Sequence, residues 1–442
     1  MTSQRRARWR FGLRIVVSSP TYVPFVGGTR TFLESMARRL VADDHEVTVV
    51  TTNARQASDF WQPPTSGLPD LPTREVLDGV SVERLALTYP RPAPYLFGLL
   101  RRAGLWLHLS KLPACLTWPV QLHLSRWMPP LAGLSQTLDR LVSEADLIHA
   151  DDSSWDGLYV AASRMARRHG KPLVVRPLMH LGSSWVRAHH QMAHQLEVYR
   201  QAAVVLALSQ TEAEAYATLG VPASRIRVVR MGVEPANELS AEDLDIEGFR
   251  RDLAVEGPII AFVGANTYDK GAFTLAEAVL ELNARGLPVN LVCAGPQRED
   301  LDRFLQRQSR EAQAVARDRI RVLGIVDEAT KRRLLAACEL FALPSQVDTF
   351  GIVFLEAWLH GKPVIGARAG GIPDLVRDEE NGLLVRFGDI DALTEAIRRL
   401  LAAPMWARHM GENGRKSLRS YTWQATYDAL LEAYHFALAG VP

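Results

Sequence analysis

Short apolar segments that alternate with helix-length segments are the feature that most constrains the fold of this chain. Alternating strands and helices predict parallel sheets covered by helices. The strand-like segments form two series, Leu13–Ser18, Glu46–Thr51, Asp146–Ala150, Pro172–Arg176, Ala203–Leu208 and Ile226–Val229, then Pro258–Gly264, Val289–Gly295, Ile320–Gly324, Leu340–Leu343 and Pro363–Gly366. We therefore predict an α/β fold with two doubly wound, Rossmann-like domains, and expect a ligand cleft between them at the carboxyl ends of the strands.

The domain boundaries follow from the gap between the two series. The acidic segment Glu238–Glu247 has no strand pattern, and 442 residues exceed what one hydrophobic core usually supports. The last helical pattern, Trp423–Leu438, has Trp, Tyr and Leu at helical spacing. We predict a first domain at residues 1–235, a connection at 236–257, a second domain at 258–415 and a C-terminal helical segment at 416–442.

Composition excludes several classes of protein. Apolar and charged contents of 47% and 23% are those of an ordinary globular chain, and a net charge of +2 gives no field for nucleic acid. The three cysteines, Cys115, Cys293 and Cys338, lack paired spacing, which argues against a disulfide framework or a CxxC metal site. The start MTSQRRARWR does not resemble a signal peptide. We expect a cytoplasmic protein.

One stretch has an unusual charge balance. Arg84–Leu138 contains six Lys or Arg residues and no Asp or Glu, together with Trp106, Trp118 and Trp127. Its longest uncharged run, Leu112–Ser125, is too short to span a membrane. Apolar bulk, tryptophans and cations are typical of a surface that contacts an anionic membrane. A cluster of short core helices with arginine rims explains the stretch equally well, so we expect at most peripheral membrane contact.

The segment 344–374, PSQVDTFGIVFLEAWLHGKPVIGARAGGIPD, predicts a cradle for a polar ligand. Glu356 is the single charge in the apolar helical run Ile352–Leu359, and a buried carboxylate without a partner costs roughly 3–5 kcal/mol. Asp348 precedes that helix, and Phe350-Gly351 leaves the first amides of the helix, from Ile352 on, free for an anion or sugar oxygens. Gly370-Gly371 forms a second turn after the next strand. Pairing of Glu356 with a core arginine such as Arg368 is the structural alternative.

Further candidates follow other predicted strands. Gly264–Gly271 reads GANTYDKG, and its flexible Lys270 suits a diphosphate, although a solvated lysine at a helix start is an alternative. Gly27-Gly28 precedes a helix and offers amides to a phosphate. His149, Asp151 and His180 end strands, where histidines are often structural. His189, His190 and His194 cluster without an HExxH pattern, so we expect no metal.

These motifs resemble the donor-site signature of glycosyltransferase family 4, which comprises retaining enzymes of the GT-B fold. An acidic residue, seven residues and Glu356 precede GKPVIG and GGIPD, and the region around Gly27-Gly28 resembles the N-terminal signature. The resemblance implies that Glu356 holds the ribose of a nucleotide sugar, that Asp348 lies against the sugar and that Lys270 binds the diphosphate. It also implies that the C-terminal helix crosses back onto the first domain, which is then the acceptor side.

The sequence departs from the family pattern at three positions. Asp348 stands where Glu is usual, Asp151 replaces the second His of His-x-His, and Ala265 occupies the place of a diphosphate-binding arginine. Arg230 or Arg368 could compensate for Ala265.

The predicted function is retaining transfer of a hexose-type sugar from a nucleotide sugar to an acceptor hydroxyl in carbohydrate biosynthesis, with no cofactor and no metal. The open alternatives are a catalytically silent sugar- or nucleotide-binding protein, a nucleotide-sugar epimerase and a sugar phosphorylase. We expect a donor, an unidentified acceptor and no nucleic acid as partners.

Overall fold

The computed structural model describes residues 12–25, 27–62, 70–89, 93–110, 112–234, 244–296 and 298–440. The start MTSQRRARWR and residues 236–243 of the predicted connection lie outside this part. The described residues form two units: unit 1 draws on Met1–Met179, Ser184–Arg230 and Thr426–Pro442, and unit 2 on His180–Ser183 and Met231–Ala425.

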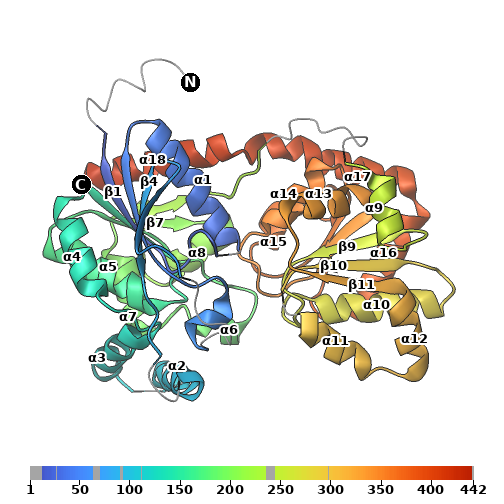
Figure 1. Cartoon of the computed structure of the whole chain (residues 1–442), viewed down its shortest axis with the longest axis horizontal. Coiled ribbons are helices and arrows are strands. Elements are labelled where there is room, and N and C mark those ends of the chain that lie inside the picture. Colours follow the sequence, from blue (N-terminus) through green and yellow to red (C-terminus); the bar gives the residue numbers. More distant parts are fainter. Residues whose placement is uncertain are drawn as a thin grey trace. The chain divides into compact units, whose positions relative to one another are not determined.

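Unit 1 contains an eight-stranded sheet in the order β3-β4-β2-β1-β5-β6-β7-β8 (Figure 1). All neighbouring strands are parallel except β3 and β4. The strands are β1 (Arg14–Ser18), β2 (Glu46–Thr52), β3 (Arg74–Leu77), β4 (Val80–Leu85), β5 (Leu147–Asp151), β6 (Leu173–Arg176), β7 (Val204–Ala207) and β8 (Ile226–Val228). The predicted parallel α/β fold is therefore confirmed for this unit.

Sequence reasoning misses β3 and β4, which form a hairpin at the edge of this sheet. Their turn is Asp78-Gly79, and both residues have positive φ, 50° and 80°. Asp-Gly is a strong sequence signal for such a turn. The signal is hidden here because the two strands carry charged residues, so neither forms an apolar run.

Helices cover the sheet of unit 1. They are α1 (Gly28–Ala42), α2 (Ala93–Leu109), α3 (Ala114–Leu124), α4 (Leu134–Glu144), α5 (Asp156–Arg168), α6 (Ser184–Ala188), α7 (Ala193–Gln201), α8 (Gln210–Thr218) and α18 (Trp423–Leu438). From Thr426 onward α18 belongs to this unit, as predicted: its Tyr427 donates to Asp43 (2.9 Å), and its Tyr434 hydroxyl lies 2.8 Å from His149 Nδ1. The helices α2 and α3 lie at the end of unit 1 opposite α18 (Figure 1).

Unit 2 contains a six-stranded, all-parallel sheet in the order β11-β10-β9-β12-β13-β14. Its strands are β9 (Ile259–Val263), β10 (Asn290–Ala294), β11 (Ile320–Gly324), β12 (Leu340–Leu343), β13 (Val364–Ala367) and β14 (Leu383–Val385). Its helices are α9 (Ile246–Asp252), α10 (Ala272–Ala284), α11 (Arg298–Gln306), α12 (Arg310–Arg319), α13 (Glu328–Ala337), α14 (Ile352–Leu359), α15 (Ile372–Leu375), α16 (Ile390–Ala402) and α17 (Pro404–Ser417).

Burial explains why the central strands of both sheets could be recognised from sequence. Strands β5, β6, β9, β10 and β12 are buried along almost their whole length, because helices cover both faces of a parallel sheet. They therefore read as continuous apolar runs. No helix in the described residues is both long and apolar enough to cross a bilayer.

Candidate functional site

Three loops of unit 2 meet at the carboxyl ends of neighbouring strands β9, β12 and β13. The amide of Gln346 donates to the carbonyl of Asp269 (2.9 Å), which joins the first loop to the second. The amide of Gly371 donates to the carbonyl of Asp348 (3.1 Å), which joins the second loop to the third. Backbone hydrogen bonds thus bring together candidates that lie about 100 residues apart in the sequence.

Lys270 and Asp348 form an ion pair at the centre of these loops. Lys270 Nζ lies 3.0 Å from Asp348 Oδ2, and the two side chains are 24% and 17% exposed. Burial opposes ionisation of Asp348, but the charge of Lys270 and hydrogen bonds from Ser345 and Lys270 outweigh it and lower the pKa of Asp348. The carboxylate is therefore ionised and remains open to a ligand.

Glu356, on α14, pairs with a residue that sequence reasoning misses. Lys331 Nζ, from α13, lies 2.8 Å from Glu356 Oε1 and also 3.0 Å from Glu328. Burial raises the pKa of Glu356, while Lys331 acts against this rise. Glu356 Oε2 is buried and has no hydrogen-bond partner among the described residues, so it remains available to accept a hydrogen bond.

The structural alternative for Glu356 therefore had the wrong partner. Arg368 forms an ion pair with Asp378 instead. The scarcity of lysine, six against 45 arginines, was the available signal for Lys331. It could not identify the contact, because α13 and α14 belong to different strand–helix units along the chain.

Glycines shape the backbone of the site. Gly271 and Gly351 precede α10 and α14 with φ of 82° and 81°. A Cβ on Gly271 would lie 2.4 Å from the carbonyl oxygen of Pro344, and one on Gly370 would lie 2.2 Å from that of Asp348. The loops can approach this closely only with glycine at these two positions.

The remaining predicted residues of unit 2 frame these loops. Gly264 directly follows β9, and its backbone lies close to that of Gly295. A Cβ on Gly295 would lie 1.9 Å from the Gly264 carbonyl oxygen. The side chain of Phe350 is buried and packs against Tyr421, so it is part of the core. The helix α14 begins two residues later, at Ile352. Gly371 precedes the short α15.

His180 also lies in unit 2, close to the ion pair. Its Nδ1 is 2.5 Å from the carbonyl oxygen of Val347, which identifies this nitrogen as the donor. Burial and the charge of Lys270 lower the pKa of His180. The imidazole is therefore neutral beside Lys270 at pH 7.

Asn266 is a site residue that sequence reasoning misses. It follows Ala265, is fully buried, and donates through Nδ2 to the carbonyls of Gly295 (3.0 Å) and Pro296 (2.9 Å). It thereby fixes the loop that carries Lys270. Arg230, one of the two arginines that could compensate for Ala265, belongs to unit 1.

The polar candidates of unit 1 lie inside the unit. His149 and Asp151 are 1% and 0% exposed, and Asp151 receives two hydrogen bonds from the equally buried Arg176, at 2.5 and 3.0 Å. The Arg176 guanidinium also stacks on the ring of Phe32, 3.6 Å from its centroid. Burial and Arg176 lower the pKa of His149 to about 3, so the ring is neutral. In this structure these groups hold β5, β6, α1 and α18 together.

Of the other unit 1 candidates, Gly28 is open to its surroundings, whereas His190 and His194 are buried. Gly27-Gly28 begins α1, and a Cβ on Gly28 would meet nothing within 4 Å. His190 lies 3.3 Å from Ser153 Oγ, and His194 lies 2.8 Å from Asp156 Oδ2, inside a buried polar network. No three His, Cys, Asp or Glu side chains of the described residues are placed to hold a metal ion.

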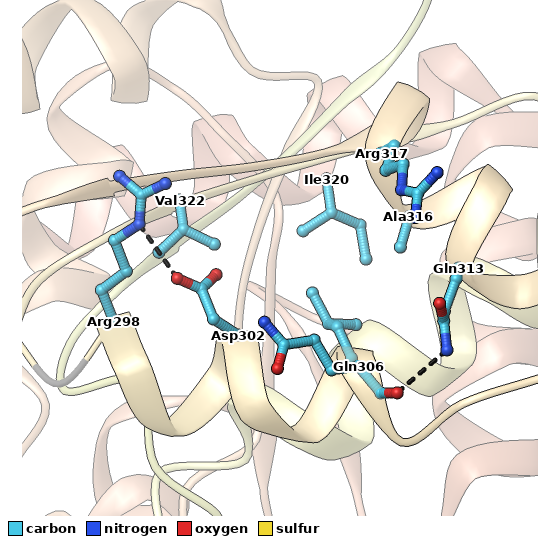
Figure 2. Close-up of a pocket in the computed structure, with 9 residues that line it drawn as sticks. Arg298, Asp302, Gln306, Gln313, Ala316, Arg317, Ile320 and Val322 are labelled. Carbon is cyan, nitrogen blue, oxygen red and sulfur yellow. Dashed lines mark hydrogen bonds and ion pairs between the residues drawn. The ribbon is translucent and has the colours of Figure 1, made fainter.

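A cavity of about 380 Å³ lies elsewhere in unit 2, between α11, α12 and β11 (Figure 2). Ile320, Val322 and Ala316 supply its apolar part, and Arg298 and Arg317 lie at its rim. Arg298 is already paired with Asp302, at 3.2 Å. None of the predicted site residues lines this cavity.

Both halves of the chain match known sequence families. The glycosyl transferase 4-like domain matches residues 27–232, and the family of glycosyl transferases group 1 matches residues 245–417. An uncharacterized glycosyltransferase of Methanocaldococcus jannaschii is 24% identical over 96% of this chain and 99% of its own length. The D-inositol 3-phosphate glycosyltransferase of Corynebacterium glutamicum is 33% identical, over 49% of this chain and about half (52%) of that enzyme.

Solved structures share the fold. Anabaena Alr3699/HepE, solved in complex with UDP and glucose, superimposes with a TM-score of 0.70 at 20% identity, over 96% of this chain and 99% of that one. Sucrose-phosphate synthase from Thermosynechococcus elongatus gives a TM-score of 0.65 at 20% identity with the same coverage. The two predicted Rossmann-like domains thus have the GT-B fold.

Proposed function

Since the chain belongs to the glycosyltransferases whose two domains it matches, we propose that it is a retaining enzyme that takes a sugar from a nucleoside-diphosphate donor bound by unit 2. The observation that supports this proposal is the Lys270–Asp348 ion pair, at 3.0 Å, in the same unit as the unpartnered oxygen of Glu356. A cation, an ionised carboxylate and a free acceptor oxygen match the three parts of such a donor: diphosphate, sugar and ribose. The UDP held by the similar Anabaena protein is consistent with this class of ligand.

Lys270 has the role of binding the donor diphosphate. Its ammonium is partly exposed and pairs with a single carboxylate in the free protein. A diphosphate carries more negative charge than Asp348, so it competes for Lys270 when it binds. The exchange leaves Asp348 free to face the sugar and leaves Lys270 to neutralise the departing nucleotide. The proposed reaction therefore needs no metal.

Transfer with retention needs few further groups. The bond between sugar C1 and the phosphate oxygen breaks while the acceptor oxygen bonds to C1 on the same face. The proton of the acceptor hydroxyl moves to the departing phosphate oxygen, so no separate base is required. Asp348, whose pKa is lowered chiefly by Lys270 acting against burial, stays ionised and stabilises the positive charge that develops on the sugar ring.

Glu356 has the role of holding the ribose. Lys331 fixes its Oε1 at 2.8 Å, which leaves the buried Oε2 as an acceptor for a ribose hydroxyl. A buried acceptor without a partner costs free energy, roughly 1–3 kcal/mol, and a hydroxyl of the donor would recover it. The position on a rigid helix keeps that oxygen in place.

The acceptor side is proposed for unit 1. Gly27-Gly28 at the start of α1 offers amides to a phosphate group, and an inositol phosphate enzyme is among the relatives by name. We also propose that the protein works in peripheral contact with an anionic membrane in the cytoplasm, because Arg84–Leu138 combines six cations and three tryptophans with no acidic residue. Neither assignment is needed for the donor chemistry.

The test is donor turnover in a nucleotide-release assay with a panel of nucleoside-diphosphate sugars. Lys270→Ala should weaken nucleoside-diphosphate binding by at least about tenfold, since a charge-assisted hydrogen bond contributes about 1.5–3 kcal/mol. Lys416→Ala removes an exposed lysine of α17 and is the matched control. Wild-type affinity in Lys270→Ala for every nucleotide, or no consumption of any donor by the wild type, would contradict the proposal.

A further inference from the structure

The end of unit 1 formed by α2 and α3 exposes an unusual amount of apolar surface. Eight of the thirteen exposed large apolar side chains in the described residues lie between Leu99 and Trp127. Scattered exposed apolar residues are ordinary, but a concentration of this kind marks an interaction surface. We call it the α2–α3 face. Its main members are Leu99, Trp106, Leu109, Leu116, Trp118 and Val120.

The helix α3 exposes apolar side chains and buries polar ones. Its sequence, ACLTWPVQLHL, has no charged residue, yet Leu116, Trp118 and Val120 point outward. Its polar Thr117 and Gln121 are buried instead, and Gln121 donates to the carbonyl of Gly104 in α2 (3.1 Å). A helix of a water-soluble surface shows the opposite arrangement. The outward face of α3 is therefore suited to an apolar partner.

The helix α2 exposes apolar side chains as well. Leu99, Trp106 and Leu109 lie at spacings of seven and three, on one side of the helix, and Arg102 is exposed between them. Leu105 points the other way and is buried. Trp127, after α3, adds a third exposed tryptophan to Trp106 and Trp118; the three are 42%, 67% and 36% exposed.

The charge of the face selects its partner. Arg102 and Arg126 are exposed, and the sequence from Arg84 to Leu138 has no acidic residue. A second copy of the chain docked by the same face would place cations against cations, because a two-fold interface pairs a surface with itself. An anionic bilayer supplies the complementary charge, and tryptophans with flanking arginines suit its interface.

The other side of α2 reaches the carboxyl end of the unit 1 sheet. The ring of Phe97 lies 6.1 Å from that of Trp155 and 5.9 Å from that of Trp61. Trp155 closes the loop that follows β5, at the edge of the sheet where ligands of doubly wound folds bind. One helix thus joins the exposed apolar face to the edge where an acceptor is expected.

We propose that the α2–α3 face docks on an anionic lipid bilayer and that the acceptor is an amphiphile drawn from that bilayer. The second part rests on the proposed glycosyl transfer, whereas the docking does not. Each exposed cation near an anionic surface contributes about 1 kcal/mol, and the buried apolar area adds to this. Docking weakens as salt rises, because the Debye length falls from about 10 Å at 0.1 M to 3 Å at 1 M.

The docking test is flotation of the full chain with vesicles of phosphatidylglycerol and phosphatidylcholine, against phosphatidylcholine alone, over a salt series. The variant Trp106→Gln/Leu109→Gln/Leu116→Gln should lower the bound-to-free ratio at least about tenfold, and its unfolding midpoint should stay unchanged because all three side chains are mostly exposed. The matched control Val76→Gln/Met405→Gln changes apolar residues that are at least as exposed but lie elsewhere, and should stay within twofold of the wild type. Brominated lipids should quench the wild-type tryptophan fluorescence.

Three outcomes would overturn the docking proposal. They are no flotation of the wild type at low salt, equal flotation of wild type and variant, and a dimer in solution that the variant dissociates. Nucleotide release from the donor, measured in the same samples, keeps the proposals apart. The variant should release nucleotide at the wild-type rate without acceptor but lose at least about tenfold in transfer to vesicle-borne acceptors. If the wild type turns over no donor, this result would count against the proposed function and not against docking.

Discussion

Both units contain charged pairs among their candidate residues, but the exposure of these pairs differs. In unit 1 the side chains of the Arg176–Asp151 pair are at most 1% exposed. In unit 2 the side chains of two pairs, Lys270–Asp348 and Lys331–Glu356, are each about one fifth exposed. A fully buried pair cannot exchange its partner for a ligand. A charged residue that follows a strand is therefore a candidate ligand-binding residue, but only a partly exposed one can exchange its partner for a ligand.

The largest predicted effect concerns the buried pair. Asp151→Ala leaves the Arg176 guanidinium buried without its partner and should lower the free energy of unfolding by about 3–5 kcal/mol. The same change at Asp348 should cost at most about 1 kcal/mol, because Lys270 can turn to solvent. Hydrogen exchange of peptides from β5 and β6, compared with β12 and β13, assigns each loss to its unit. Equal losses in the two variants would remove the distinction between the units.

The next effect concerns catalysis. Asp348→Asn keeps the size of the side chain but removes the charge that is placed to stabilise the developing cation. We expect kcat to fall about 100-fold, which corresponds to about 2.7 kcal/mol, with little change in unfolding midpoint. A coupled nucleotide-release assay under saturating donor measures this fall. If kcat stays within a factor of about two, the role assigned to Asp348 is wrong.

These contrasts show how far the sequence alone could reach. The strands β11 and β12 and the helices α14 and α18 have the predicted bounds, because a covered strand or an amphipathic helix leaves a continuous pattern. The loops with Lys270, Asp348 and Gly370 could be placed at one edge for the same reason. The partners of the charged residues could not be predicted. Lys331 pairs with Glu356, and Arg176 pairs with Asp151, because helices and strands that are distant in the sequence pack together, and no local sequence pattern indicates this packing.

A smaller effect is expected at Asp152, next to the buried pair. Its left-handed backbone (φ 59°) and its hydrogen bond from the Ser154 amide (2.9 Å) are both compatible with asparagine. Burial and the adjacent Asp151 raise the pKa of Asp152 to about 6, above the ordinary value near 3.9. The native state therefore keeps a proton that the unfolded state has lost, and stability falls as pH rises from about 4 to 6.

Asp152→Asn should remove this dependence. The variant should be more stable than the wild type by on the order of 1–3 kcal/mol at pH 7. The gain should shrink as the pH falls towards about 4 and vanish below it, where Asp152 is protonated in both the native and the unfolded wild type. Urea unfolding at pH 5, 6 and 7 measures the trend. A gain that is independent of pH would show that the buried charge is not its cause.

The smallest predicted effect concerns Glu356, and it distinguishes nucleotide binding from the sugar chemistry of Asp348. Glu356→Gln keeps an oxygen acceptor but loses the charge, so nucleoside-diphosphate affinity should fall about tenfold, or 1.4 kcal/mol, while kcat at saturating donor changes less than threefold. Glu328→Gln is the matched control, since Glu328 contacts the same Lys331 at 3.0 Å but is mostly exposed, and it should change affinity by less than twofold. Calorimetric titration with nucleoside diphosphate measures both variants. If the two variants weaken binding equally, Lys331 rather than the free oxygen of Glu356 is the group that binds the nucleotide, and the ribose assignment fails.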